Sequence, residues 1–254
     1  MPAALTFLTP IFVLAIVALL GFVGCDVVLG LSPISPIVAI SRVYQVAANQ
    51  GSGKGPFTVP YSPASSSDKF AVVISMHWGN SGGATAQVTV NGSMPQSIQT
   101  DTYDPQAVAH FIANGVQADN SGMINVSVGL SANSATAWDY CVSIYNNVNQ
   151  TSPYEFNTQR QGTAQGPIPN AVSPISINSN KNDLIYAVAV SQKAGGFLGG
   201  NVSANASFNV VENPINYFLV EDLQVDSNTM QPVMPAASAS GGANWYFFAM
   251  LLKG

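Results

Sequence analysis

Short runs of β-branched and aromatic residues, separated by clusters of turn residues, restrict the fold of this chain more than any other feature. The clearest run is 70–78 (FAVVISMHW), and 86–91 (AQVTVN) alternates with the period of two that a half-buried strand requires. Further runs of this kind cover residues 123–130, 137–145, 184–190, 206–211 and 245–252. Residues 104–114 fit a short helix or a strand equally well. The sequence predicts an all-β fold, an antiparallel β-sandwich or jelly roll.

The start of the chain is strongly apolar. Asp26 is the single charged residue between residues 3 and 31, and about 20 apolar residues are enough to cross a hydrocarbon core as one helix. We expect residues 1–31 to be a transmembrane anchor or signal segment, in which residues 3–31 contact the membrane. Residues 32–56 are predicted to be a Pro/Gly/Ser-rich connector, and residues 57–254 the β-sandwich domain.

Three fates of the apolar segment stay open. A cleaved signal peptide normally has a basic region before its apolar run, which is missing here, so an uncleaved anchor is favoured. The third fate is lipidation, because Phe22-Val23-Gly24-Cys25 is similar to a lipobox with Cys25 as the acylated residue, although Phe22 stands where leucine is usual. Arg42 and Lys54 follow the segment and by the positive-inside rule favour a cytoplasmic domain. The low charge of the domain, its sequons and the resemblance described below favour an extracytoplasmic domain, which we predict.

Charged residues are unusually rare. They make up 7% of the chain, with seven Lys and Arg against twelve Asp and Glu, where about 25% is usual. No basic cluster is present to displace phosphate counterions, so a nucleic-acid partner is excluded. Such a surface must owe its solubility to neutral polar groups, to glycans or to assembly into something larger.

Several motifs occur in a characteristic order along the domain. They are 58–60 (TVP), the run 70–78, 88–92 (VTVNG), 145–153 (YNNVNQTSP, with Asn147 where glycine is commoner), 182–184 (NDL) and 245–253. In this order they resemble β-sandwich domains of bacterial and archaeal surface and secreted proteins, also seen in phage-encoded proteins. The resemblance implies a sandwich fold and a surface setting, and it brings no catalytic residue with it.

Residues that could carry catalysis or hold a metal are few. His77 and His110 are the two histidines, and no metal-binding or nucleophile-elbow motif surrounds them. Glu221 and Asp222 are adjacent carboxylates, but in a strand they point to opposite faces, and we interpret them as solvated edge or loop charges. Asp222 and Asp226 lack a calcium-loop pattern. The sequence therefore predicts a non-enzymatic protein without cofactor or metal.

Binding and modification sites are predicted from aromatic residues, sequons and cysteines. Tyr154 and Tyr145 are the candidate ligand-binding residues, whereas the three tryptophans are expected in the core. Both cysteines, Cys25 and Cys141, are expected to be free thiols. Five sequons are candidate glycosylation sites: Asn91, Asn125, Asn149, Asn201 and Asn205.

The function expected from the sequence is structural or interactive. The chain reads as a membrane-anchored extracytoplasmic protein that assembles with itself or with neighbouring coat proteins at a cell or virion surface. A filament or pilin-like subunit, an envelope protein and a capsid-associated protein all belong to this class. A carbohydrate-binding or adhesion module is the alternative, with glycans as ligands, and a glycoside hydrolase is a remote alternative.

Overall fold

In a computed structural model of the chain, every regular element of the described residues is a β-strand. All strand pairings described are antiparallel, which confirms the predicted all-β class. The chain divides into two units, Met1–Pro36 and Ile37–Gly254. The residues that the structure describes are 38–50, 53–79, 82–103, 106–134, 137–162, 166–168, 175–193, 209–212, 218–225, 230–233, 237–239 and 243–254.

The predicted transmembrane helix falls on residues 1–31, which lie outside the described residues. The lipidation candidate Cys25 belongs to the same segment. Within the described ranges, no helix has the length and apolar character needed to cross a membrane.

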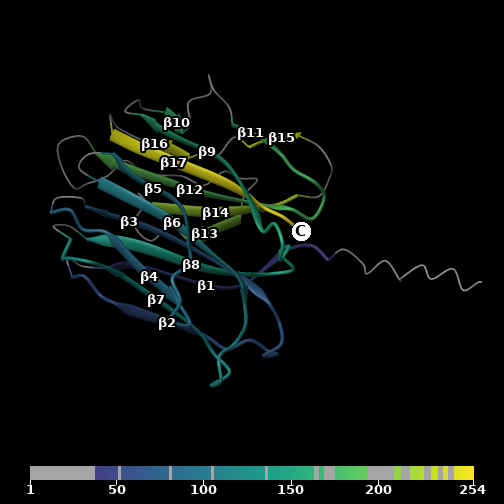
Figure 1. Cartoon of the computed structure of the whole chain (residues 1–254). Coiled ribbons are helices and arrows are strands. Elements are labelled where there is room, and N and C mark those ends of the chain that lie inside the picture. Colours follow the sequence, from purple (N-terminus) through teal and green to yellow (C-terminus); the bar gives the residue numbers. More distant parts are fainter. Residues whose placement is uncertain are drawn as a thin grey trace, which may run out of the picture. The chain divides into compact units, whose positions relative to one another are not determined.

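A five-stranded sheet, here called the central sheet, forms the middle layer of the second unit (Figure 1). Its strands in spatial order are β1 (Ser41–Gln50), β8 (Trp138–Asn146), β3 (Phe70–Gly79), β6 (Gln106–Val116) and β5 (Gln96–Tyr103). A three-stranded sheet covers one face of the central sheet. Its strands are β2 (Phe57–Tyr61), β7 (Ile124–Leu130) and β4 (Ala86–Val90).

A second five-stranded sheet, the C-terminal sheet, covers the other face of the central sheet. Its strands in spatial order are β13 (Asn209–Glu212), β14 (Phe218–Gln224), β12 (Leu184–Lys193), β17 (Ala243–Leu252) and β9 (Tyr154–Gly162). Two short ribbons complete the described elements. They pair β10 (Gly166–Ile168) with β16 (Ala237–Ala239) and β11 (Ile175–Asn178) with β15 (Met230–Val233).

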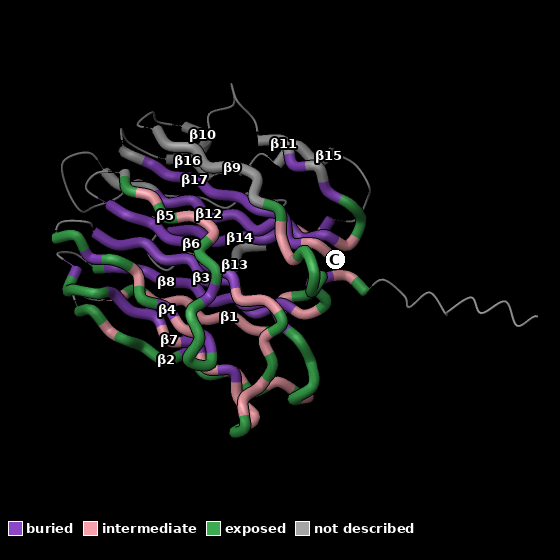
Figure 2. Tube along the Cα trace, viewed as in Figure 1, coloured by how far each residue is buried: buried purple, intermediate pink, exposed green. Residues whose placement is uncertain are grey.

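The sequence of β3 fits its place in the middle layer. All ten of its residues are buried, because one face meets the three-stranded sheet and the other meets the C-terminal sheet. Its even-numbered side chains, such as Ile74, join the core with the three-stranded sheet. Its odd-numbered side chains, such as Val73, join the core with the C-terminal sheet. In Figure 2 the buried residues accordingly follow the central strands of both five-stranded sheets.

A third core lies on the outer face of the C-terminal sheet. Leu219, Phe247 and Leu251 are fully buried there, and Ile177 of β11 packs against them. Each fully buried large apolar side chain contributes about 1.5–3 kcal/mol relative to an exposed one. The described strands therefore bury apolar residues in three successive layers, where a simple sandwich has one.

One detail differs from the sequence prediction, and one decides between alternatives that it left open. Residues 41–50 were expected within a Pro/Gly/Ser-rich connector, but they form β1, which pairs with β8 from Ser41 to Gln50 with an irregularity between Arg42 and Tyr44. The ambiguous stretch 104–114 is a strand in its described part, β6. Both segments belong to the central sheet, whose buried faces favour extended backbone over the weak local preference of these residues.

Candidate functional site

A row of buried polar side chains lies between the central sheet and the C-terminal sheet. Successive strand residues point to opposite faces, so a fixed set from each strand faces this interface. Buried polar groups cost free energy unless they find partners, and their partners decide what they can do. We call this row the polar seam; its members, each 0–4% exposed, are Ser75, His77, Gln106, His110, Asp139, Ser143 and Asp222.

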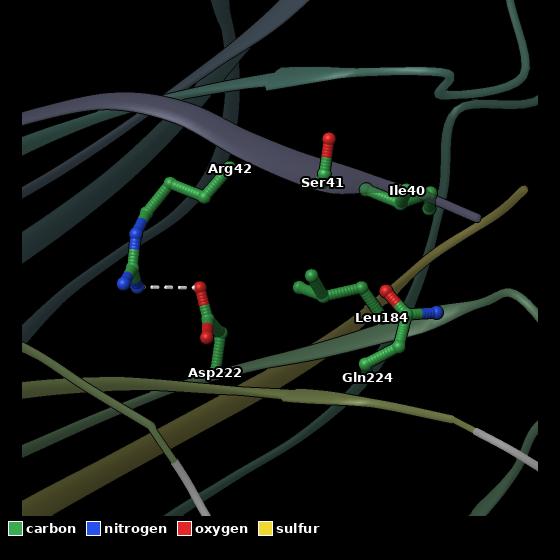
Figure 3. Close-up of a pocket in the computed structure, with 6 residues that line it drawn as sticks. All are labelled: Ile40, Ser41, Arg42, Leu184, Asp222 and Gln224. Atoms are coloured by element: carbon green, nitrogen blue, oxygen red, sulfur yellow. Dashed lines mark hydrogen bonds and ion pairs between the residues drawn. The ribbon is translucent and has the colours of Figure 1, made fainter.

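One end of the polar seam reaches the surface at Arg42. A guanidinium nitrogen of Arg42 on β1 lies 2.7 Å from a carboxylate oxygen of Asp222 on β14, and the two side chains point toward one another in Figure 3. The side chain of Arg42 is 27% exposed and that of Asp222 is 5% exposed. A pocket of about 240 Å³ surrounds this ion pair. Its lining residues are Ile40, Ser41, Arg42, Leu184, Asp222 and Gln224.

The hydroxyl of Tyr145 extends this contact inward. It donates a hydrogen bond of 3.2 Å to the oxygen of Asp222 that Arg42 also contacts. Burial raises the pKa of Tyr145 well above its usual value, and the negative charge of Asp222 raises it further. The Tyr145 hydroxyl is therefore a protonated hydrogen-bond donor at any ordinary pH.

The middle of the polar seam is a serine, a histidine and a tyrosine from three strands. The hydroxyl of Ser75 shares a 2.9 Å hydrogen bond with Nδ1 of His110 and a 2.8 Å hydrogen bond with the hydroxyl of Tyr186. The His110 ring stacks on Phe248 at 3.9 Å between ring centroids. Burial lowers the pKa of His110 from 6.5 to about 3. His110 is therefore neutral near pH 7, and its Nε2 has no hydrogen-bond partner among the described residues.

A second histidine occupies the other part of the polar seam. Nδ1 of His77 lies 3.2 Å from one carboxylate oxygen of Asp139, and the other oxygen accepts a 2.8 Å hydrogen bond from the amide of Asn49. The His77 ring also lies parallel to Phe218, with 6.3 Å between ring centroids. These contacts tie β1, β8 and β3 together and connect them to β14.

The chemistry available to the polar seam is limited by burial. Ser75 and His110 form a pair with the composition of a nucleophile and a base, but both side chains are 0% exposed, so a substrate has no path to them. Asp139, the acid that could orient a catalytic histidine, contacts His77 and not His110. Within the described ranges, no three His, Cys, Asp or Glu side chains gather closely enough to hold a metal. The arrangement hydrogen-bonds two sheets to each other.

A second pocket, of about 360 Å³, lies where the edge strand β5 meets the turn before β4. Trp78 and Phe111 provide aromatic rings, and Nε1 of Trp78 donates to the carbonyl of Ala84 at 3.0 Å. Thr100 and Thr102, both exposed, stand on the same face of β5. We call it the threonine pocket; its lining is Trp78, Gly83, Ala84, Thr85, Ala86, Thr100, Thr102, Ala107 and Phe111.

The two tyrosines predicted to bind ligand lie in different surroundings. Tyr145 is 0% exposed and belongs to the polar seam. Tyr154 is partly buried at the start of β9, and its hydroxyl accepts a 2.8 Å hydrogen bond from Gln96. The structure does not bring these two residues into one site. The three tryptophans, Trp78, Trp138 and Trp245, are 0–6% exposed, which confirms that they belong to the core.

The interpretation of Glu221 and Asp222 as solvated charges is wrong. Both belong to β14, an inner strand of the C-terminal sheet, and they are 1% and 4% exposed. Asp222 faces the central sheet, and its neighbour therefore points to the outer face, as expected for adjacent residues of a strand. Cys141 is buried and is not in a disulfide. Asp226 lies outside the described residues.

Three of the five predicted glycosylation sites lie on described loops or strands. Asn91 occupies the turn after β4, Asn125 lies in β7, and Asn149 lies in the loop between β8 and β9. Asn201 and Asn205 lie outside the described residues.

Arg42 and the threonine pocket are the features that sequence reasoning missed. Arg42 is one of only seven basic residues in the chain. In a sequence with so few charges, a single cation in an extended segment indicates an ion pair with a carboxylate elsewhere in the chain. Thr100 and Thr102 alternate in a strand, which indicates a hydroxyl-bearing face. Neither pattern could indicate which distant strand completes the site.

Comparison of the chain with protein-family models, with curated proteins and with solved structures gives no match in any of the three.

Proposed function

We propose that this protein is a membrane-anchored, non-enzymatic structural protein whose β body stands outside the cytoplasm and assembles with further copies of itself at a cell or virion surface. Residues 3–31 are the membrane contact in this proposal. The strands of the unit Ile37–Gly254 are the assembling body. The proposal includes three kinds of structural protein: a filament subunit, an envelope protein and a capsid-associated protein.

The edge of the central sheet supports self-assembly. β1 is ten residues long and pairs with β8 on one side, and no other described strand pairs with it. Soluble proteins usually protect such an edge with proline, with charged side chains, including inward-pointing ones, or with a β-bulge. β1 contains no proline, and its single charged residue, Arg42, and its irregularity both lie near its start. The irregularity between Arg42 and Tyr44 leaves 44–50 as the regular part of the edge.

A second copy is the occupant that suits this edge. Two identical β1 strands can pair antiparallel about a two-fold axis, so that each edge meets the same residues of the other. Because the guanidinium of Arg42 is already paired with Asp222, such a contact brings no like charges together.

The buried polar groups support a structural role over a catalytic one. The described histidines, His77 and His110, are both engaged between strands and 4% or less exposed. Asp139 and Asp222 each join strands that are distant in sequence. Buried side chains that hydrogen-bond one another across strands rigidify a fold and help to specify it.

The mass of the full chain extracted in mild detergent tests this proposal. We expect an oligomer for the natural sequence and a shift toward the monomer for Val43→Lys, which places a charge on the 36% exposed Val43, next to the regular part of the β1 edge. Met94→Lys is the matched control, because Met94 is 85% exposed in a turn away from β1. A natural chain that is monomeric would refute self-assembly. Oligomers of equal size for all three chains would refute the role of β1.

The threonine pocket supports carbohydrate binding as a second candidate function. Its exposed threonine hydroxyl groups can hydrogen-bond the hydroxyls of a sugar, and Trp78 and Phe111, which are 2% and 9% exposed, add a small apolar surface. Glycan-array binding by the full chain should weaken in Thr100→Val and Thr102→Val, which keep the side-chain shape. Thr58→Val, at an exposed position of β2, is the control. Binding lost instead in Tyr154→Ala would move the site to β9, and an array without binding would remove this candidate.

A glycoside hydrolase is the remote alternative. Its two carboxylates must face one cleft about 5–10 Å apart, whereas Glu221 and Asp222 point to opposite faces of the C-terminal sheet. This alternative would be supported if the natural chain hydrolysed a glycan substrate and if each of the variants Glu221→Gln and Asp222→Asn lost that activity.

A further inference from the structure

We infer that Asn149 is a site of N-linked glycosylation and that Asn91 and Asn125 are not, although all three belong to sequons. This inference rests on the proposed extracytoplasmic position of the β body, because the modification takes place outside the cytoplasm. It is carried by the hydrogen bonds of the three side-chain amides, which differ in a way that the sequence does not show.

Asn149 presents its amide nitrogen to solvent. Its side-chain oxygen accepts hydrogen bonds of 2.9 Å from the backbone N–H groups of Thr151 and Ser152, so the side chain is fixed in a turn of the Asx type. Its Nδ2 makes no hydrogen bond to any described residue. Both Asn149 and Thr151, the hydroxyl residue of the sequon, are exposed.

The backbone beneath this side chain is held in place. The backbone N–H of Asn149 donates to the carbonyl of Lys253 at 2.8 Å, and its carbonyl accepts a 3.3 Å hydrogen bond from the amide of Asn114. A glycan on Nδ2 would therefore extend from an anchored loop without breaking a described contact of the fold.

Asn91 and Asn125 use their amide nitrogens inside the fold. Nδ2 of Asn91 donates to the carbonyl of Gln117 at 2.9 Å, and its side-chain oxygen accepts from the backbone N–H of Asn125 at 2.8 Å. Nδ2 of Asn125 donates to a carboxylate oxygen of Asp119 at 3.0 Å. Glycosylation replaces one of the two N–H bonds of the amide, so a sugar on either nitrogen would have to fit beside the acceptor that this nitrogen contacts in the fold.

The reaction is a glycosyl transfer from a lipid-linked oligosaccharide. Nδ2 of Asn149 forms a bond to the anomeric carbon of the first sugar, and the bond from that carbon to the diphosphate oxygen breaks. The polyprenyl diphosphate leaves with the bonding electrons, and the amide proton passes to a base of the transferase. The step needs no oxidant or reductant.

Translation of the full chain with microsomes tests the inference. Asn201→Gln and Asn205→Gln are introduced throughout, so that only the three described sequons remain. One form keeps its natural N-terminus, and a second carries a cleavable secretion signal that directs the body into the lumen. We expect a glycosidase-sensitive band in the second form. It should persist in Asn91→Gln and Asn125→Gln and disappear in Asn149→Gln, and mass spectrometry should locate the sugar at residue 149.

The two forms separate this inference from the proposed function. If added protease digests the β body of the form with the natural N-terminus, the extracytoplasmic position is refuted. The signal-bearing form would still test whether Asn149 is glycosylated. A protease-protected, signal-bearing chain without glycan would overturn the inference. A glycan found at residue 91 or 125 would overturn it as well.

Discussion

The hydroxyl of Ser75 on β3 lies 2.9 Å from Nδ1 of His110 on β6, and neither side chain has any exposed surface. In an open cleft the same pair would be a candidate for nucleophilic catalysis. Here Tyr186 and the ring of Phe248 enclose it. Its consequence is therefore a dependence of stability on pH.

His110 should destabilise the fold in acid. Its pKa is lowered by burial from 6.5 to about 3, so the unfolded chain binds a proton below pH 6.5 that the folded chain does not accept until about pH 3. The contribution to stability is intact above pH 6.5 and falls progressively between these values, by about 1.4 kcal/mol for each pH unit. His110→Phe, which keeps an aromatic ring against Phe248, should lose less stability over this range.

Denaturant titrations of both chains between pH 7 and pH 3 measure this difference. Equal losses of the free energy of unfolding would show that His110 does not titrate as its burial requires.

Arg42 and Asp222 should contribute unequally to stability. Arg42→Met leaves the carboxylate of Asp222 buried without its cation and should cost about 3 kcal/mol. Asp222→Asn leaves a guanidinium that is 27% exposed and can turn to water, so it should cost about 1–2 kcal/mol. Chemical denaturation of the two variants tests this order, and a larger cost for Asp222→Asn would contradict it.

Ile74 and Ile112 should report on the two faces of the central sheet. Ile74 packs toward the three-stranded sheet and Ile112 toward the C-terminal sheet. Truncating either to Ala should cost about 2–5 kcal/mol, because each leaves a cavity in a closed core. Thermal unfolding should show both losses, whereas an exposed face would make one substitution nearly neutral.

Cys141 should be unreactive in the folded chain. Its side chain is 0% exposed, beside Ser143 at 3.5 Å between sulfur and oxygen. In a Cys25→Ser background, a thiol reagent such as Ellman's should label it only after denaturation. Rapid labelling of the native protein would contradict the closed interface between the two five-stranded sheets.

Local patterns predicted much of the fold but not its layering. The run 70–78 indicated β3 correctly, because β-branched and aromatic residues fit a buried strand. A strand with this sequence could have one face or both faces packed against another sheet. The position of β3 in the middle layer was therefore not predictable from the run alone. β1 was not predicted, because its apolar and polar residues alternate only weakly. It also lies between a proline-rich stretch and a glycine-rich stretch, which favour a connector.

The site depended on pairings between distant residues. Tyr145 and Asp222 are 77 positions apart, and Arg42 and Asp222 are 180 positions apart. Asp222 was interpreted as solvated because an adjacent pair of acidic residues is usually at the surface. Its burial follows from the place of β14 between β13 and β12, which no local pattern of the sequence contains.

Electron microscopy of the native membrane or particle that carries this chain tests the central claim most directly. The account predicts β bodies projecting from the membrane in contact with one another, with the β1 edges of neighbouring copies paired. Isolated bodies without such contacts, or bodies on the cytoplasmic side, would contradict it.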